Sequence, residues 1–151
     1  MLSNTCKYGI RALVYLAVNT DGSQRIGIKQ ISDDLGIPSP FLGKIMQQLA
    51  KHKLLSSYKG PNGGFIFLKD PNEICILDIV KIIDGTDSFI DCFMGLKICE
   101  GKVENKDKCP LHKKSGILRD HIYEVFEKTT IGEIASDIKA TSKSDKEKWY
   151  V

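Results

Sequence analysis

The stretch from residue 28 to residue 68 constrains the fold of this chain more than any other. Two short helical patterns, over residues 28–35 and 41–52, are separated by a turn that begins at Gly36, a residue suited to a left-handed helix end. Ser39 and the proline after it predict the start of the second helix, because a serine oxygen caps free amides and proline fits a first helical turn. Two helices across so short a turn predict a helix-turn-helix.

The second of these helices is expected to bury one face and present the other. Its apolar residues, Leu42, Ile45, Met46 and Leu49, recur at helical spacing and should face inward. The opposite face offers hydroxyl, amide and amine groups that suit base edges and phosphates. Its members are Ser39, Phe41, Lys44, Gln47, Gln48 and Lys51. An ordinary polar face of an amphipathic helix is the simpler alternative.

A glycine-rich hairpin follows this helix. Apolar segments at residues 54–58 and 65–68 flank Lys59-Gly-Pro-Asn-Gly-Gly64. A hairpin directly after a helix-turn-helix is a wing, so we expect Lys59 at its base and Asn62 in its loop to contact DNA, with Lys59 directed toward a minor groove. A phosphate cradle for a nucleotide is the alternative, but the glycine spacing matches neither the P-loop nor the dinucleotide fingerprint.

Charge is unevenly distributed along the chain. The net charge is only +3, yet residues 36–69 contain five lysines and no Asp or Glu. Residues 1–70 carry nine Lys and Arg against four acids, whereas the remainder carries thirteen against fifteen. A basic excess concentrated in one segment is the pattern expected of a nucleic-acid surface.

Three of the five cysteines lie in a polar segment after this region. Cys92, Cys99 and Cys109 are followed by His112, and cysteines without a helical or strand period are poor candidates for core. A helix starting near Pro110 would let Cys109 and His112, three residues apart, reach one centre. The pattern predicts a site that binds either an iron–sulfur cluster or a zinc ion. The spacing of the cysteines alone leaves both possibilities open.

The other helices are expected to form the core and a dimer contact. Cys6 belongs to an apolar stripe of a first helix that ends near residue 19, and Cys75 lies among isoleucines, so both are expected in the core. A long amphipathic helix over residues 111–128 should pair with a second copy through Leu118, Ile122 and Val125. Thr130-Ile-Gly-Glu133 is a capping box that opens a last helix to about residue 138.

Length and composition are those of a small globular protein. With 151 residues, 42% hydrophobic and 27% charged, the chain is long enough for a core of its own. It contains no apolar run long enough for a membrane span and no signal-peptide pattern, so we expect a cytoplasmic protein with reduced cysteines. We expect three parts: a winged helix-turn-helix domain (1–84), a cluster loop with a dimerisation helix (85–138), and a flexible tail (139–151).

Together, these motifs resemble those of the Rrf2 family of bacterial winged helix-turn-helix regulators. The resemblance rests on Cys6-Lys-Tyr-Gly-Ile-Arg-Ala-Leu13, on the helix from Ser39, on the wing glycines, on the three spaced cysteines and on Thr130-Ile-Gly-Glu133. It implies a mainly α fold with a β-hairpin wing, and a homodimer that binds a pseudo-palindromic operator on double-stranded DNA. It also implies an iron–sulfur cluster whose state controls that binding.

The resemblance further implies a ligand set. Cys92, Cys99 and Cys109 correspond to the cluster cysteines, and His112 to the histidine ligand of members with a [2Fe–2S] centre. The gaps between the cysteines are longer here, which keeps [4Fe–4S] as an alternative. Other members take a carboxylate from the first helix, where this chain has Lys7, so His112 is preferred.

The expected function is therefore that of a transcriptional regulator, a repressor in the first instance, that senses iron–sulfur status, nitric oxide or redox stress. A cluster-free or zinc-binding regulator is one alternative. An iron–sulfur electron-transfer protein is another, although the sequence shows no catalytic or nucleotide motif and we do not expect an enzyme.

Overall fold

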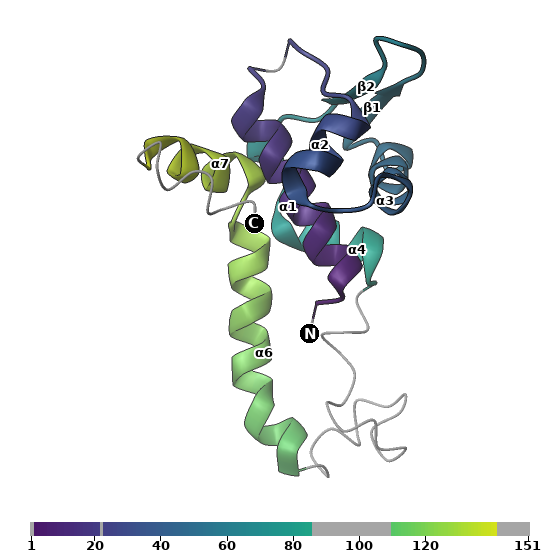
Figure 1. The fold of residues 1–151 in the computed structure, drawn as a ribbon. Coiled ribbons are helices and arrows are strands. Elements are labelled where there is room, and N and C mark those ends of the chain that lie inside the picture. Colours follow the sequence, from purple (N-terminus) through teal and green to yellow (C-terminus); the bar gives the residue numbers. More distant parts are fainter. Residues whose placement is uncertain (1, 22, 86–109, 142–151) are drawn as a thin grey trace.

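The computed structural model describes residues 2–21, 23–85 and 110–141. Within these ranges the chain is mostly helical with one two-stranded antiparallel hairpin (Figure 1), which confirms the expected fold class. The elements are α1 (Asn4–Asn19), α2 (Ile28–Leu35), α3 (Ser39–Lys51), β1 (Leu55–Tyr58), β2 (Gly64–Phe67), η1 (Pro71–Glu73), α4 (Ile76–Ile83), α6 (Pro110–Lys128) and α7 (Ile131–Ala140).

Helix α1 is the centre of the core. The Ser3 side chain caps it by accepting a hydrogen bond from the Cys6 backbone N–H at 3.0 Å. Helices α2, α3, α4 and α7 all pack against α1. Cys6 is fully buried, which confirms it as a core residue. Burial raises the pKa of the Cys6 thiol to about 12, and the neighbouring Asp84 carboxylate contributes, so this cysteine stays protonated at neutral pH.

The helix-turn-helix forms as expected, with one correction at the start of α3. Gly36 ends α2 in the left-handed region at φ 64°, and α3 begins three residues later. The residue that caps α3 is Pro38, and Ser39 is already the first helical residue without a side-chain capping bond. The prediction that Ser39 caps the helix is therefore wrong: Pro38 accepts the first helical bonds through its carbonyl, from Phe41 and Leu42.

The hairpin is fixed to the rest of the subunit by backbone hydrogen bonds to the free edge of β2. Strands β1 and β2 pair from Leu55–Phe67 to Tyr58–Gly64. On the other side of β2, Ile26 and Phe65 exchange two backbone hydrogen bonds, of 3.1 and 2.9 Å. Gly64 fits this close approach because a Cβ there would lie 2.5 Å from the Ile26 carbonyl oxygen, at a φ of 156°.

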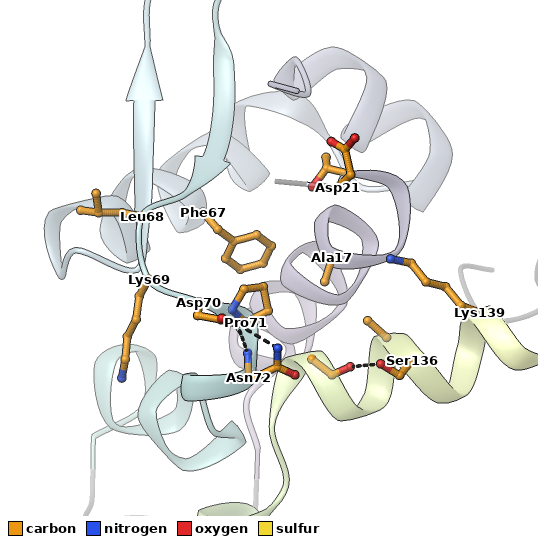
Figure 2. A pocket seen from close by; sticks show the side chains of 13 residues that line it. Ala17, Asp21, Phe67, Leu68, Lys69, Asp70, Pro71, Asn72, Ser136 and Lys139 are labelled. Atoms are coloured by element: carbon orange, nitrogen blue, oxygen red, sulfur yellow. Dashed lines mark hydrogen bonds between the residues drawn. The ribbon is translucent and has the colours of Figure 1, made fainter. Parts of the chain in front are cut away.

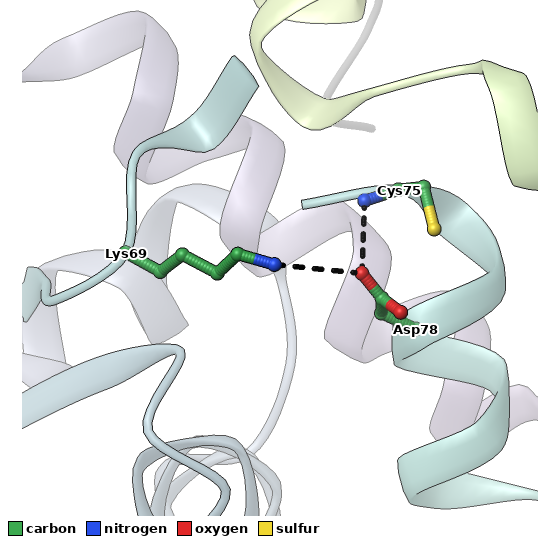
Figure 3. Close-up of polar contacts among 3 residues, drawn as sticks. All are labelled: Lys69, Cys75 and Asp78. Atoms are coloured by element: carbon green, nitrogen blue, oxygen red, sulfur yellow. Dashed lines mark hydrogen bonds and ion pairs between the residues drawn. The ribbon is translucent and has the colours of Figure 1, made fainter. Parts of the chain in front are cut away.

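The start of α4 is capped, and it contacts both the residues that follow β2 and the residue that precedes α7. The Cys75 backbone N–H donates to the Asp78 carboxylate at 3.3 Å, and the Lys69 ammonium lies 4.0 Å from the same oxygen (Figure 3). Cys75 also forms an isolated β-bridge with Thr130. Its side chain is only half-buried, so the prediction of a core position is wrong for Cys75, and partial burial raises the pKa of its thiol.

Helix α6 projects from the body, and α7 folds back onto it (Figure 1). Thr130 caps α7 by accepting from the Glu133 backbone N–H at 3.1 Å, which is one of the two hydrogen bonds that its capping-box motif predicts. Ile131, Ala135 and Ile138 of α7 are buried in the core that includes α1. The core therefore includes residues beyond the predicted limit at residue 84, and α7 continues through residue 140 into the segment predicted as a tail.

Candidate DNA-binding surface

Helix α3 presents an exposed, polar outer face. Lys44, Gln47 and Lys51 are exposed, Phe41 is 40% exposed and Ser39 is half-buried. A Cβ added at Gly43 would meet nothing within 4 Å, so the surface is low and open there. Phe41 is held in place by an edge-on contact with the Tyr8 ring, with ring centroids 5.8 Å apart. Four of the six predicted α3 residues are thus exposed, and Ser39 is partly so.

Gln48 is the exception on this helix. Its side-chain amide donates a 2.7 Å hydrogen bond to the backbone carbonyl of Ile82, in the last turn of α4. The prediction that Gln48 faces outward toward bases is wrong, because helical position 48 lies at the border between the buried and exposed faces. A partner from another element fixes the amide there, and sequence periodicity carries no information about that partner.

The wing and the two short helices enclose a groove. The groove has a volume of about 380 Å³ and is lined by α2, α3 and hairpin residues, among them Lys29, Gly43, Gln47, Tyr58 and Lys59. Lys59 follows the last residue of β1, so it stands at the tip of the wing and not at its base. Lys59 and Asn62 are both exposed. The groove is thus bordered by amide and ammonium groups from three elements.

Two basic residues of this surface, Arg25 and Lys29, were not predicted from the sequence. Arg25 lies with its guanidinium carbon 3.6 Å from the centroid of the Tyr58 ring, a close cation–π stack at the side of the wing. Lys29, in the first turn of α2, lines the groove. The available signal was the position of Arg25 next to Ile26, but a single bridging residue is too short to be recognised as a strand.

Of the four predicted metal ligands, only His112 belongs to a described helix. Cys92, Cys99 and Cys109 lie outside the described residues. His112 is in the first turn of α6, but its side chain is not among those described. Within residues 2–21, 23–85 and 110–141, no three His, Cys, Asp or Glu side chains gather in a way that could hold a metal ion. The ligand set therefore stays a prediction.

The predicted dimer seam lies on an exposed apolar face of α6. Leu118 is 59% exposed, Val125 is 44% exposed, and Ile117 beside them is 83% exposed. Ile122, the third predicted seam residue, is half-buried within the subunit. Because exposed aliphatic side chains on one helix are costly in water, this face suits association with another apolar surface.

A second hollow, of about 440 Å³, lies between the end of α1, the residues after β2, and α7 (Figure 2). Its polar groups are largely bonded to one another. Asn72 donates to the Asp70 carboxylate through both its backbone N–H and its amide, and Ser136 donates to the Gly132 carbonyl. As a separate finding, no helix in the described part of the chain has the length and apolarity of a bilayer span.

Comparison with known proteins places these features in a family. A family model described as an iron-dependent transcriptional regulator, Rrf2, matches residues 2–137. An HTH-type transcriptional regulator of Aquifex aeolicus is 34% identical over 134 residues, which cover 89% of this chain and 90% of that one. The HTH-type transcriptional regulator IscR of Cronobacter sakazakii is 26% identical over 146 residues, or 97% of this chain and 86% of the relative.

Solved structures share the fold. CymR, described as the global cysteine regulator of B. subtilis, superposes with a TM-score of 0.71 at 22% identity, covering 91% of this chain and 97% of its own. IscR of T. potens superposes with a TM-score of 0.66 at 23% identity, covering 91% and 87%. The family model, which spans nearly all of the described residues, and the similarity to other regulators confirm the expected family: this chain belongs to the Rrf2 family of helix-turn-helix transcriptional regulators, which are not enzymes.

Proposed function

We propose that this regulator binds a specific operator as a homodimer and that an iron–sulfur cluster held by residues 92–112 controls the binding. The observation that carries the DNA part is the groove between α2, α3 and the wing. There Lys29, Gln47 and Lys59 come from three separate elements to border one concave surface. Such a surface suits the negatively charged backbone of a DNA duplex. In this arrangement α3 would enter the major groove and the wing would lie at the adjacent minor groove.

The division of labour within this surface follows from side-chain chemistry. Lys44, Lys51 and Lys59 are exposed ammonium groups suited to phosphates, which supply affinity that falls as salt rises. Gln47 offers a donor and an acceptor together and suits a base edge, so it is the residue of α3 that we assign to sequence reading. Asn62 and Arg25 place further donors beside the wing.

The dimer sets the form of the operator. A single α3 helix reads only a few base pairs, whereas a two-fold dimer reads two half-sites about one helical turn apart in inverted orientation. The exposed aliphatic side chains of α6, Ile117, Leu118 and Val125, supply the apolar surface for this association. The operator is therefore a pseudo-palindrome, read by the protein in the cytoplasm.

The cluster assignment rests on donor chemistry. Three thiolates and an imidazole suit an iron–sulfur cluster. Cys92, Cys99 and Cys109 stand in a polar stretch of sequence, whereas Cys6 is buried and its thiol stays protonated. The name IscR among the relatives and the iron-dependent description of the family agree with this choice. We prefer [2Fe–2S] with His112 as fourth ligand over [4Fe–4S], and zinc is the alternative occupant. A bound cluster would supply a redox-sensitive and oxidation-sensitive centre.

The proposal is tested by anaerobic purification, with iron, sulfide and zinc analysis and a visible spectrum. Near-equal iron and sulfide are expected, and zinc without sulfide would replace the cluster by a zinc site. His112→Ala should shorten the lifetime of the cluster, and His112→Cys should lengthen it and lower its reduction potential, because a thiolate donates more charge than an imidazole. A parent-like spectrum, potential and lifetime in His112→Ala would move the fourth ligand elsewhere.

Binding is then compared between the loaded and the stripped protein. The probe is a duplex selected from a randomised DNA pool by the parent protein, measured against a scrambled duplex of the same composition. A changed affinity for the selected duplex, with little change for the scrambled one, is expected if the cluster controls operator recognition. Equal affinities in both states would reject cluster control while leaving the DNA-binding assignment intact.

A further inference from the structure

The end of α4 is hydrogen-bonded to α3 and to the start of α1. On one side, the Gln48 amide of α3 donates to the Ile82 carbonyl at 2.7 Å. On the other side, the Asp84 carboxylate accepts from the Ser3 backbone N–H at 2.8 Å and from the Ser3 hydroxyl. Ser3 in turn caps α1. One turn of α4 thus holds the start of α1 and the second half of α3.

The hydrogen bond from Gln48 meets a group that needs it. The final carbonyls of a helix lack partners within that helix, and Ile82 lies one residue before the end of α4. Gln48 is half-buried at the contact between α3 and α4, where an unsatisfied carbonyl is costly. A hydrogen bond has a preferred length and direction. The bond from the Gln48 amide to the Ile82 carbonyl therefore restricts how α3 can rotate about its own axis relative to α4.

Packing at the same place leaves little freedom for the helices to slide. A Cβ at Gly9 of α1 would come within 2.6 Å of the Ile83 side chain and 3.3 Å of the Ile45 side chain. Helices α1, α3 and α4 are therefore in close contact around Gly9. The Tyr8–Phe41 ring contact ties α1 to the first turn of α3 as well. A shift of the end of α4 must then displace α3 or break these contacts.

We propose that Gln48 is a positioning residue, which sets the orientation of α3 on DNA through the last turn of α4 and makes that orientation depend on the segment that follows Gly85. The dependence on that segment rests on the proposed function, because it carries Cys92, Cys99 and Cys109. The orientation role itself rests only on the contacts among α1, α3 and α4. It replaces a base-reading role for Gln48.

The test compares two substitutions of the same kind at neighbouring positions. Gln48→Met keeps the length of the side chain and removes the donor to Ile82. Gln47→Met is the control, since Gln47 is exposed in the groove and makes no such tie. Affinities are measured for the stripped, reduced protein with the selected duplex, a scrambled duplex, and a set of single-base-pair changes in the selected duplex. Circular dichroism and thermal unfolding confirm that both variants are folded.

Gln48→Met should bind the selected duplex more weakly, by up to about tenfold, because the cost of misorienting α3 is limited by the one hydrogen bond that held it. Its affinity for the scrambled duplex and its salt dependence should equal those of the parent, and the loss should be spread over all the base pairs of the half-site. Gln47→Met should instead lose discrimination at one or two base pairs. Parent-like selectivity in Gln48→Met, or a loss confined to one base pair, would overturn the positioning role.

A second readout addresses the link to the segment after Gly85. The ratio of affinities between loaded and stripped protein should move toward one in Gln48→Met and should stay at the parent value in Gln47→Met. An unchanged ratio in Gln48→Met would overturn the link. If the parent itself shows a ratio of one, cluster control fails as a function, and the selectivity measurements on the stripped protein still decide the positioning role.

Discussion

Helices α3 and α6 are both amphipathic in sequence, yet their apolar faces meet different fates. The four inward-facing residues of α3, Leu42, Ile45, Met46 and Leu49, are at most 2% exposed. On α6, Ile117, Leu118 and Val125 remain between 44% and 83% exposed. Helix α3 finds its partners, α1, α2 and α4, within the same chain. Of the elements in the described ranges, α6 makes extensive contacts only with α4.

The difference teaches that the same sequence pattern can specify folding in one place and association in another. The buried face of α3 contributes to the stability of the subunit, and its exposed face is free for DNA. The apolar face of α6 contributes to stability only when a second surface covers it, and in the proposed homodimer a second copy of α6 would supply that surface. Predictions that separate subunit stability from association therefore test the comparison.

The largest effect is expected from shortening a buried side chain of α3. Leu49→Ala should lower the free energy of unfolding by about 2–5 kcal/mol, because it removes apolar contacts and leaves a cavity. Urea unfolding followed by circular dichroism measures this loss. The control is Leu68→Ala, at a side chain that is 59% exposed, which should change stability by less than about 0.5 kcal/mol. Similar losses in the two variants would show that the α3 face is not core.

A charge on the exposed face of α6 should break association and spare the fold. Leu118→Glu should weaken the dimer by a factor of about 100 or more, since burying an unpaired carboxylate is costly. Light scattering and operator binding measure the outcome. Leu118 is a cleaner site than the half-buried Ile122, where a charge would also disturb contacts within the subunit. Glu127→Lys, a charge reversal at an exposed position on the opposite face of the same helix, is the control. An intact Leu118→Glu dimer would place the seam elsewhere.

A smaller effect is expected on the exposed side of the DNA-binding region. Lys59→Ala should weaken DNA binding several-fold at low salt and reduce the slope of log affinity against log salt by about 0.9, the value for one phosphate contact. Fluorescence anisotropy across a salt series measures both quantities. Lys139→Ala, at an exposed position of α7, is the control and should leave the slope unchanged. The assignment of the wing to DNA fails if the two variants give the same slope.

The smallest effect concerns the end of α3. Lys53 follows the C-cap residue His52 and has φ 63°, a left-handed conformation that glycine adopts more easily. Lys53→Gly should raise the free energy of unfolding by about 0.5–1 kcal/mol, the strain relieved less the added entropy of the unfolded chain. Lys51→Gly, still within α3, should lower it by about 1 kcal/mol. Thermal unfolding of the pair measures both signs, and a loss in Lys53→Gly would contradict the assigned strain.

Particular residues show how far local sequence reasoning reached. Gly36, Thr130 and the inward stripe of α3 act through neighbours within a few positions, so their roles were predictable and are confirmed. Lys59 was placed at the wrong end of the wing: it directly follows the first strand, and that position is the turn end of a hairpin and not its base. Arg25 and Gln48 were missed or misassigned, since their partners, Tyr58 and Ile82, are more than thirty positions away in sequence.

The sequence by itself determined the secondary structure, the inward faces of the helices and the basic character of the α3 and wing region, because periodicity, caps and charge are local properties. Only the tertiary structure decided that α7 returns to pack on α1, that Ile26 pairs with the free edge of β2, and that Gln48 is hydrogen-bonded to α4. These contacts depend on where chain segments meet in space. A residue at the border of a helix face, such as Gln48, is assigned to one side or the other only by the group that lies opposite it.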